Sequence, residues 1–488
     1  MVETILIVGL VVVLFIAALM LVRTLRFGRK VEPVALLEAA EVDEDIVAEH
    51  LAAVIHARTI STGESDPPAR VAFLDLHRTL ENLYPRVHTH LRREIINDYS
   101  LLYIWPGSQP DLPGIVLAAH LDVVPVDPAT AAEWEQEPFS GAIADGFVWG
   151  RGTLDIKNQV TTLLDAVETL LRNGFQPQRT VYLAFGHDEE IGGLNGGKQI
   201  VNWLASHECE LEAVLDEGGS IVQGVLPGVK GPVALVGTSE KGYLTLEMTV
   251  NAAPGHSSQP PKQSAVGILA LALARLEANP MRTHVHMVHN LFAGIGGAAP
   301  FGLQFAFANL WLLGGVVRHQ LEANPSTNAT IRTTTALTIF QSGIKDNILP
   351  RQAKAFINFR ILPGDTIASV CEHVRRVVDD PRVGFEPMVG AAWEASPLSP
   401  DNSPAYDGLD RTIRQIFGNI PVTPYMVLGA TDSRHYATLC KQVYRFSPVE
   451  LQASDLPRMH GSNERIALPA VSQMVQFYLQ LIHTWAGE

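Results

Sequence analysis

The sequence predicts an α/β fold with a mostly parallel sheet, interrupted by an inserted α+β domain and preceded by a transmembrane helix. Short apolar runs alternate with amphipathic helical segments up to about residue 237, strands with one exposed face begin near Thr238, and the α/β pattern returns near residue 397. An uncharged apolar run stands at the N-terminus. These changes predict four segments: an anchor (4–22), a main domain in two parts (31–237 and 397–488), and the inserted domain (238–396).

The N-terminal segment is a candidate transmembrane helix. Residues 4–22 are nineteen residues without a charge, and at 1.5 Å per residue they span about 28 Å, the thickness of a bilayer core. A signal peptide needs basic residues before its apolar run, but only Glu3 and the α-amine precede this one. Four basic residues follow it: Arg23, Arg26, Arg29 and Lys30. The positive-inside rule then predicts that the C-terminal bulk is cytoplasmic. A signal peptide and a buried helix are the alternatives.

The first part of the main domain begins with residues 31–110, whose mixed polarity predicts a helical lead-in. Residues 158–173 carry apolar side chains at helical spacing, and Gly174 stands where a helix C-terminus favours glycine. Alternation of strands and helices predicts a parallel sheet with ligand sites at the carboxyl ends of its strands. The remaining predicted elements are strands at 114–119, 180–185 and 212–215 and a helix at 193–206.

The inserted domain has a different pattern. Strands are predicted at 242–252, 333–341 and 353–362, and helices at 263–278 and 366–379. The segment 281–325 is apolar and rich in glycine. It is compatible with core packing, which is the ordinary interpretation, with a surface for an acyl chain, or with a membrane-facing patch.

Composition excludes several classes of protein. The chain has 488 residues, of which 47% are hydrophobic and 18% charged, so it can bury a large core and is not disordered. Its net charge of −15 argues against a nucleic-acid-binding protein, because phosphate contacts need clustered basic residues. The three cysteines, Cys209, Cys371 and Cys440, form neither a disulfide framework nor a zinc-finger pattern.

Polar residues of the kind that bind metals follow the predicted strands. They occur in the strings AAHLDVVP, GRGTLDIKN, FGHDEEIGG, LDEGG and RMHGSNERI. Five such clusters would converge on one edge of the sheet. The side chains concerned are His120, Asp122, Asp155, Glu189, Glu190, Asp216, Glu217 and His460.

This inventory fits two divalent cations. Zinc accepts imidazole nitrogen and carboxylate oxygen, and two neighbouring cations need a bridging carboxylate and about two further ligands each. Asp122 lies two residues after His120 and suits the fixing of the imidazole tautomer. The Glu189–Glu190 pair suggests that one carboxylate binds metal while the other takes a proton from metal-activated water.

Together these motifs resemble the aminoacylase/carboxypeptidase family of co-catalytic zinc peptidases, from about residue 45 to the C-terminus. The strings GHDEE, DIKN, GHSSQPP, RTTTALTIFQSGIKDN and NFRILPGD are most similar to its carboxypeptidase S and N-acyl-amino-acid hydrolase branch. The resemblance implies two Zn²⁺ per chain, a catalytic domain in two parts, and an inserted lid domain that forms a dimer.

The resemblance also assigns roles. His120 is a ligand of one zinc, Asp155 bridges both, and Glu190 and His460 bind the other. The last ligand is Asp216 or Glu217, and spacing does not decide between them. Glu189 is the general base and Asp122 the acid that supports His120.

The expected lid contributes further residues by the same resemblance. His256 corresponds to a histidine that crosses a dimer to the oxyanion. Asn347, Arg360 and Thr431 correspond to residues that hold or adjoin the substrate carboxylate, for which a planar guanidinium is suited.

The expected reaction is hydrolysis of an amide bond next to a free carboxylate, in dipeptides or N-acyl amino acids, and the apolar 281–325 segment favours an apolar acyl or side-chain group. Expected partners are the small-molecule substrate, a membrane and a second copy of the chain, without nucleic acid. The alternatives are an N-deacylase of a small biosynthetic intermediate such as a desuccinylase, a non-catalytic membrane-tethered binding protein, and a structural adaptor. Topology stays open, because the flanking charges predict a cytoplasmic domain whereas the resembling branch acts in lumens or outside cells.

Overall fold

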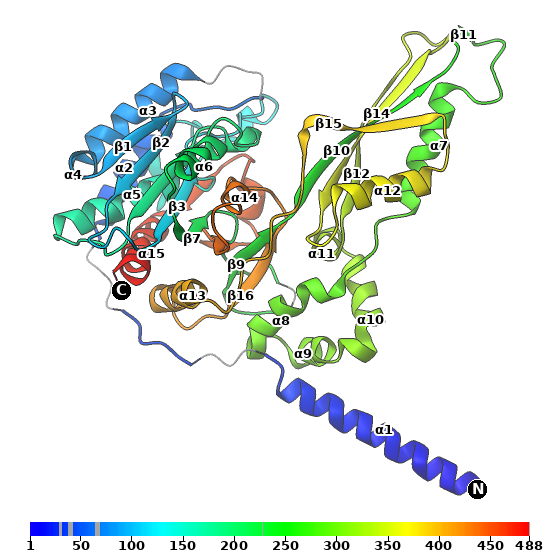
Figure 1. Cartoon of the computed structure of the whole chain (residues 1–488), viewed down its shortest axis with the longest axis horizontal. Helices are drawn as coiled ribbons and strands as arrows, with labels where there is room; N and C mark the ends of the chain where they lie inside the picture. Colours follow the sequence, from blue (N-terminus) through cyan, green and yellow to red (C-terminus); the bar gives the residue numbers. More distant parts are fainter. Residues whose placement is uncertain (29–31, 38–41, 64–68, 227, 488) are drawn as a thin grey trace.

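The computed structural model describes residues 1–28, 32–37, 42–63, 69–226 and 228–487. Within these ranges a ten-stranded sheet and a separate four-stranded sheet form two bodies, which stand side by side in Figure 1. Strands β9 (Val233–Glu240) and β10 (Gly242–Asn251) carry the chain from the first body to the second. The α/β class predicted from the sequence is confirmed.

The large sheet is mixed, which corrects the expectation of a mostly parallel one. Strand β3 (Gly114–His120) pairs in parallel with β6 (Val181–Gly186) and β7 (Leu211–Asp216), as predicted. Antiparallel pairs adjoin this parallel centre, among them β1 with β2 and β8 with β9. The strand order is β1-β2-β6-β3-β7-β17-β9-β8-β18, and β16 pairs with β9. The bounds are β1 (Arg92–Ile96), β2 (Ser100–Trp105), β8 (Ile221–Gln223), β16 (Val422–Val427), β17 (Val443–Arg445) and β18 (Glu450–Gln452).

The segment expected as a helical lead-in is helical only in its first half. Helices α2 (Glu44–Ile55), α3 (Arg70–Leu83) and α4 (Pro85–His90) are followed by the β1–β2 hairpin. Strand β2 is buried along its whole length, so its run of apolar residues has no polar alternation to reveal a strand.

Both faces of the large sheet are covered, because side chains alternate along a strand. Ile115 and Leu117 of β3 join a cluster with α2, α5 (Lys157–Arg172) and α15 (Leu468–Ala486). Val116 and Ala118 face the opposite cluster, which α6 (Gly197–Ser206) and α14 (Ser433–Tyr436) cover. The parallel strands β3, β6 and β7 therefore end together at one edge between two helical layers.

The second body is an antiparallel sheet in the order β12-β14-β10-β15. In β14 (Gln352–Ile361) alternate side chains from Ala353 to Ile361 are buried against α7 (Ala265–Ala278) and α12 (Ile367–Val378). The outer strands are β12 (Thr334–Ser342) and β15 (Val383–Trp393). The sheet thus runs from Gly242 to Trp393, inside the predicted inserted domain of 238–396.

The apolar segment 281–325 is only partly core. Helix α8 (His289–Ile295) buries Leu291 and Ile295 against the β9–β16 region. Helices α9 (Phe301–Ala308) and α10 (Leu310–Glu322) follow at an angle of 118° to each other. Near them ends the N-terminal helix α1 (Val2–Leu25), whose N-terminal part points away from both bodies in Figure 1. Among the described residues α1 is the one single helix long and apolar enough to cross a membrane.

Candidate metal centre and substrate cavity

The candidate metal centre lies at the edge of the large sheet where β3, β6 and β7 end. His120 is the last residue of β3, Glu189 follows β6, and Asp216 is the last residue of β7. Parallel pairing of these strands puts their carboxyl ends at the same edge. The structure thus brings the predicted residues together from segments far apart in the sequence.

His120 directs one ring nitrogen into this cluster. Its Nδ1 lies 3.0 Å from the backbone oxygen of Asp122, so Nδ1 carries the proton in the neutral ring. Its Nε2 lies 3.1 Å from Asp155 Oδ1 and 3.3 Å from Glu217 Oε1. The ring is buried, and the unprotonated Nε2 is therefore free to bind a cation.

Asp155 stands between two imidazoles. Its Oδ1 faces His120 and its Oδ2 lies 2.9 Å from Nε2 of His460. Nε2 of His460 is also 3.3 Å from Glu190 Oε2. One carboxylate therefore reaches two groups of donors, with His120 on one side and His460 and Glu190 on the other.

Glu217 and Asp216 differ in direction. Glu217 joins His120 and Glu189 in a group whose candidate ligand atoms lie within 4.8 Å of one another. The Oδ1 of Asp216 instead accepts a hydrogen bond from the Glu217 N–H, 2.9 Å away. The geometry thus favours Glu217 over Asp216 as a ligand, an alternative that spacing left open.

Asp122 does more than face His120. Its two carboxylate oxygens accept hydrogen bonds from the backbone N–H groups of Glu189 and Glu190, at 3.1 and 3.2 Å. Oδ1 is also 3.3 Å from His120 Nδ1. One buried carboxylate therefore fixes both the imidazole and the pair of glutamates.

The loop that carries Asp155 is held by a residue to which the sequence gave no role. Glu464 is fully buried and accepts hydrogen bonds from the backbone N–H groups of Gly152, Leu154 and Asp155, at 3.0, 2.8 and 3.2 Å. It also pairs with Arg151 at 2.5 Å. The sequence feature that could have identified Glu464 is its position four residues after His460, inside the same turn-rich string.

The electrostatics of the cluster call for a cation. Burial raises the pKa of Glu189 and of Glu190, and it raises that of Glu217 to about 8; neighbouring carboxylates add to each shift. Hydrogen bonds to Asp155 and Glu190 raise the pKa of His460 to about 10. Oε1 of Glu190 is buried and has no hydrogen-bond partner among the residues that the structure describes. Buried carboxylates and two imidazoles are a donor set that fits zinc, whose charge would stabilise the ionised acids.

A cavity of about 550 Å³ opens beside these residues. Its walls come from both bodies: Asp155, Glu190, Glu217 and His460 from the first, and Tyr243, Arg360 and Trp393 from the second. Thr431 also lines it, with its N–H and hydroxyl donating to Glu240 Oε2 at 3.0 and 2.9 Å. Of the predicted substrate residues, Arg360 and Thr431 thus lie at the cavity.

The cavity wall also carries two arginines, which rest on a pair of aromatic rings that the sequence analysis did not identify. Tyr243 and Trp393 stack with ring centroids 4.6 Å apart. Arg360 lies 4.7 Å from the Tyr243 ring and Arg434 lies 4.4 Å from the Trp393 ring. Arg434 also donates to the carbonyl of Gly192. The cavity therefore has an acidic side and a cationic side.

His256 and Asn347 do not line this cavity. They lie together in the two-stranded pair β11 (Gly255–His256) and β13 (Ile348–Leu349), where Ser257 N–H donates to the Asn347 carbonyl at 3.2 Å. Figure 1 shows β11 at the end of the second body, away from the large sheet. Nδ1 of His256 is engaged by the Ser258 hydroxyl at 2.8 Å.

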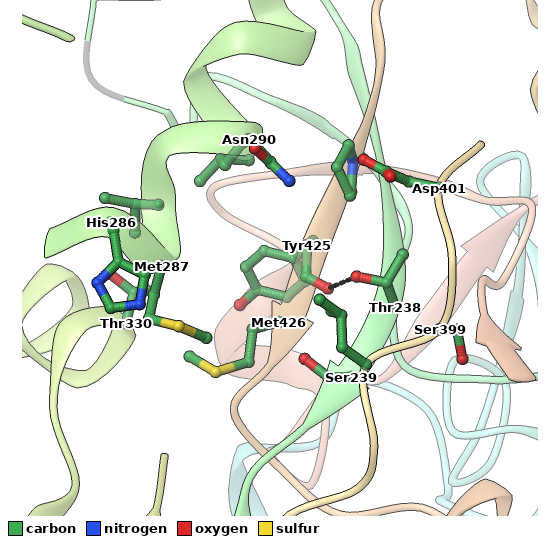
Figure 2. A pocket seen from close by; sticks show the side chains of 14 residues that line it. Thr238, Ser239, His286, Met287, Asn290, Thr330, Ser399, Asp401, Tyr425 and Met426 are labelled. Carbon is green, nitrogen blue, oxygen red and sulfur yellow. Dashed lines mark hydrogen bonds between the residues drawn. The ribbon is translucent and has the colours of Figure 1, made fainter. Parts of the chain in front are cut away.

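A second cavity of about 270 Å³ lies between α8 and strands β9 and β16. Figure 2 shows Met287 and Met426 facing it, with Tyr425 between them and Thr238. Met426 lines this cavity and its neighbour Val427 lines the first one, so the end of β16 separates the two.

The chain is similar to several known proteins. The model of peptidase family M20/M25/M40 matches residues 116–484. The chain is 42% identical over 488 residues to the N-fatty-acyl-amino acid synthase/hydrolase PM20D1 of Xenopus tropicalis, covering 97% of this chain and 93% of that protein. It is 40% identical over 477 residues to the probable carboxypeptidase S-like 2 of Dictyostelium discoideum, covering 96% and 91%. The metallo-carboxypeptidase Sso-CP2 of Sulfolobus solfataricus shares the fold, with a TM-score of 0.64 at 16% identity over 90% of this chain and 99% of that one.

Proposed function

Because this chain belongs to peptidase family M20/M25/M40, whose members are metallohydrolases, we propose that it uses two zinc ions to hydrolyse the amide bond next to a free carboxylate. The observation that carries the proposal is the placing of Asp155 between His120 and His460. His120 and Glu217 would hold one ion, His460 and Glu190 the other, and Asp155 both. When bound, the two ions would polarise the scissile carbonyl and lower the pKa of water.

Glu189 is the proposed general base. Its Oε2 lies 3.8 Å from His120 Nε2, and its backbone is held by Asp122. Both glutamates lie on a one-turn 3₁₀ helix, but only Glu190 approaches His460. Glu189 thus keeps a carboxylate beside the reacting centre, where it takes a proton from water and passes it to the leaving amine.

The cationic wall positions the substrate. A free carboxylate bound at Arg360 would direct the neighbouring amide toward the acidic side of the cavity, which is where Glu189 stands. Arg434 supports the same wall. This arrangement favours substrates with a carboxylate next to the scissile amide.

We further infer an apolar acyl group. Ile191, Val427, Trp393 and Met459 line the cavity beside the charged groups. The relative from Xenopus tropicalis is named for N-fatty-acyl amino acids, and that from Dictyostelium discoideum for carboxypeptidase S. Activity on an N-long-acyl amino acid should therefore exceed activity on a Gly-X dipeptide, and turnover of the dipeptide alone would contradict the inference.

Helix α1 is the proposed membrane anchor. Its mean hydropathy is 3.4 in the most apolar window, of which only 6% is buried. Its last turn, however, packs against the chain: Thr24 is buried and bonds to Asn309 at 3.2 Å. A cleaved signal peptide would leave Asn309 without this partner, so a retained anchor is favoured. Resistance of the full chain to carbonate extraction tests this.

A second copy of the chain is the proposed source of His256 and Asn347 at the site. Within one chain both lie at the end of the second body, outside the cavity. An exposed histidine on a projecting strand pair is placed to reach a neighbouring subunit. There it would stabilise the developing oxyanion.

The decisive experiment uses the full chain in detergent. It measures metal content and hydrolysis of a panel of N-acyl amino acids, N-succinyl amino acids and dipeptides. Glu189→Gln should keep both zinc ions and lose about 10²- to 10⁴-fold in kcat. Glu277→Gln, which changes an exposed glutamate on α7, is the matched control and should keep wild-type kcat.

Each alternative has its own result. Turnover confined to N-succinyl substrates would identify a biosynthetic desuccinylase. Ligand binding without zinc and without turnover would identify a membrane-tethered binding protein. Equal turnover in the Glu189→Gln and wild-type chains would refute the assignment of the base.

A further inference from the structure

The helix pair α9–α10 is attached to the end of α1. The stripe Ile16, Met20 and Thr24, spaced four residues apart, is the less exposed side of α1, and Met20 and Thr24 are buried. Arg23 Nε donates to the Ala308 carbonyl at 3.0 Å. Phe27 packs edge-on against His289 at 5.7 Å between ring centroids. The last two turns of α1 therefore lie against α9 rather than standing free.

Asn309 holds α1 against the α9–α10 pair by hydrogen bonds. This residue lies between α9 and α10 and is fully buried. Its amide nitrogen lies within hydrogen-bond distance of the Met20 carbonyl at 3.3 Å, Thr24 Oγ1 at 3.2 Å and the Phe305 carbonyl at 2.8 Å. Buried amide groups that are paired in this way fix the relative position of the helices that carry them.

The outer side of the helix pair is apolar and exposed. Phe301, Trp311, Leu312 and Val316 have exposed fractions of 56%, 53%, 52% and 70%. Residues 301–317 contain no charge, and the first basic residues, Arg318 and His319, follow directly. Soluble surfaces rarely gather large apolar side chains in this way, and such patches mark interaction sites.

The bend decides what this surface can contact. The two helices meet at 118°, and α9 has eight residues, or about 12 Å, so neither helix spans a bilayer core of about 30 Å. Helices that expose apolar side chains on one side, and do not span, can instead bury that side at the boundary between lipid headgroups and acyl chains. Figure 1 shows α9 and α10 at the end of the molecule from which α1 departs.

We propose that α9 and α10 form a platform, made of Phe301, Trp311, Leu312 and Val316, that sits in the same leaflet of the bilayer as the C-terminal end of α1. This inference rests on the proposed membrane anchor. The lipid surface is the occupant because the patch continues directly from α1, at the level of its last two turns. The Asn309 contact holds α9 and α10 at the C-terminal end of α1. Helix α8, which packs against the β9–β16 region, connects this helix pair to the main body.

The test uses the tryptophan of the platform. The other six tryptophans are Trp105, Trp134, Trp149, Trp203, Trp393 and Trp485, all in the two sheet bodies or their helices. The full chain is reconstituted in vesicles of phosphatidylcholine brominated near the headgroup end of its acyl chains. The emission of the wild type should fall relative to unbrominated vesicles, and the W311F variant should lose most of this quenching.

A matched pair of variants controls for exposure. In the W311F background, V316W should restore quenching. V389W should not, although Val389 on β15 is 97% exposed. Retained hydrolysis of the substrate shows that each variant is folded.

Two outcomes separate this inference from the proposed anchor. Chain that is extracted by carbonate would refute the anchor itself. Chain that resists carbonate but shows equal or no quenching in wild type and W311F would refute the platform alone. Restored quenching in both V316W and V389W would also overturn it, because bromolipid would then report exposure rather than position.

Discussion

Replacing Arg360 by methionine should selectively impair substrates that carry a free carboxylate. Arg360 and Arg434 share the cationic wall, but the hydrogen bonds of their guanidinium groups differ. Arg434 donates to the Gly192 carbonyl, whereas the guanidinium of Arg360 makes no hydrogen bond to another described residue and rests on the Tyr243 ring. The guanidinium of Arg360 therefore keeps its donors for a ligand, and a planar fork matches a carboxylate in two places.

The size of the effect follows from the position of Arg360. Two unit charges 4 Å apart interact by about 4 kcal/mol at the effective dielectric of a partly buried site. Arg360 is half-buried, so water screens part of this energy. A loss of about 2–3 kcal/mol remains, which corresponds to a fall of about 30- to 160-fold in kcat/KM. Arg360→Lys keeps the charge but loses the fork, and should fall between the variant and the wild type.

The assay compares an N-acyl amino acid with its carboxamide. For Arg360→Met, kcat/KM should fall on the acid and stay nearly unchanged on the carboxamide, since the carboxamide offers no charge. Arg434→Met should lower both, because it disturbs the Trp393 stack and the Gly192 contact. Equal losses of Arg360→Met on acid and carboxamide would refute the reasoning, and a carboxylate effect confined to Arg434→Met would reassign it.

Three further predictions test the site and the fold. Glu189→Gln and His256→Ala should each be inactive alone, and their co-expression should restore about a quarter of wild-type turnover, because half of the dimers would be mixed and one of the two sites in each mixed dimer would be intact; activity of His256→Ala alone would place His256 outside the site, and inactivity of the mixture would contradict its supply by a second copy. Glu217→Gln should lower the bound zinc measured by atomic absorption, whereas the matched Asp216→Asn should lower it less; the reverse order would exchange their roles. Burial lowers the pKa of Lys241 to about 7, and unfolded lysine has a pKa near 10.4, so its buried neutral form destabilises the fold progressively as pH falls from about 10 to 7. Lys241→Met should flatten the dependence of the unfolding free energy on pH in that range by about 1.4 kcal/mol per pH unit, and an unchanged slope in denaturant titrations would contradict this.

Part of the metal centre could be anticipated from sequence because its residues stand at strand ends. His120, the Glu189–Glu190 pair and Glu217 end or follow strands β3, β6 and β7, and parallel strands that end together converge whatever their separation in the chain. Asp155 and His460 lie in loops instead, and tertiary packing brings them to the same edge. The choice between Asp216 and Glu217 could not be made in this way, since it depends on which way two adjacent side chains turn.

Other features depend on tertiary packing that leaves no local pattern. The stack of Tyr243 on Trp393 joins residues 150 positions apart on paired strands, and neither residue belongs to a motif. The β1–β2 hairpin lacks polar alternation, so its residues were predicted to be helical. For the segment 281–325 the sequence left core packing, an acyl-chain surface and a membrane-facing patch open, and its helices divide between core, the end of α1 and an exposed patch. Composition alone does not distinguish these environments.

Arg360 comes from the second body and the acids come from the first, so the distance between them depends on the crossing between the sheets. The two segments of chain that connect the bodies are hydrogen-bonded to each other at this crossing. Glu240 N–H donates to Ser396 Oγ at 2.8 Å, and Ser396 N–H donates to the Glu240 carbonyl at 3.1 Å. At Gly242 a Cβ would lie 2.5 Å from the Ala395 nitrogen, so the close approach of the segments requires glycine. The Glu240 carboxylate meanwhile holds Thr431 and pairs with buried Arg445 at 3.2 Å. The crossing that positions Arg360 is thus tied through one glutamate to the loop of the first body that carries Thr431. A substrate that bridges both sides would be held by a connection that restricts their relative movement.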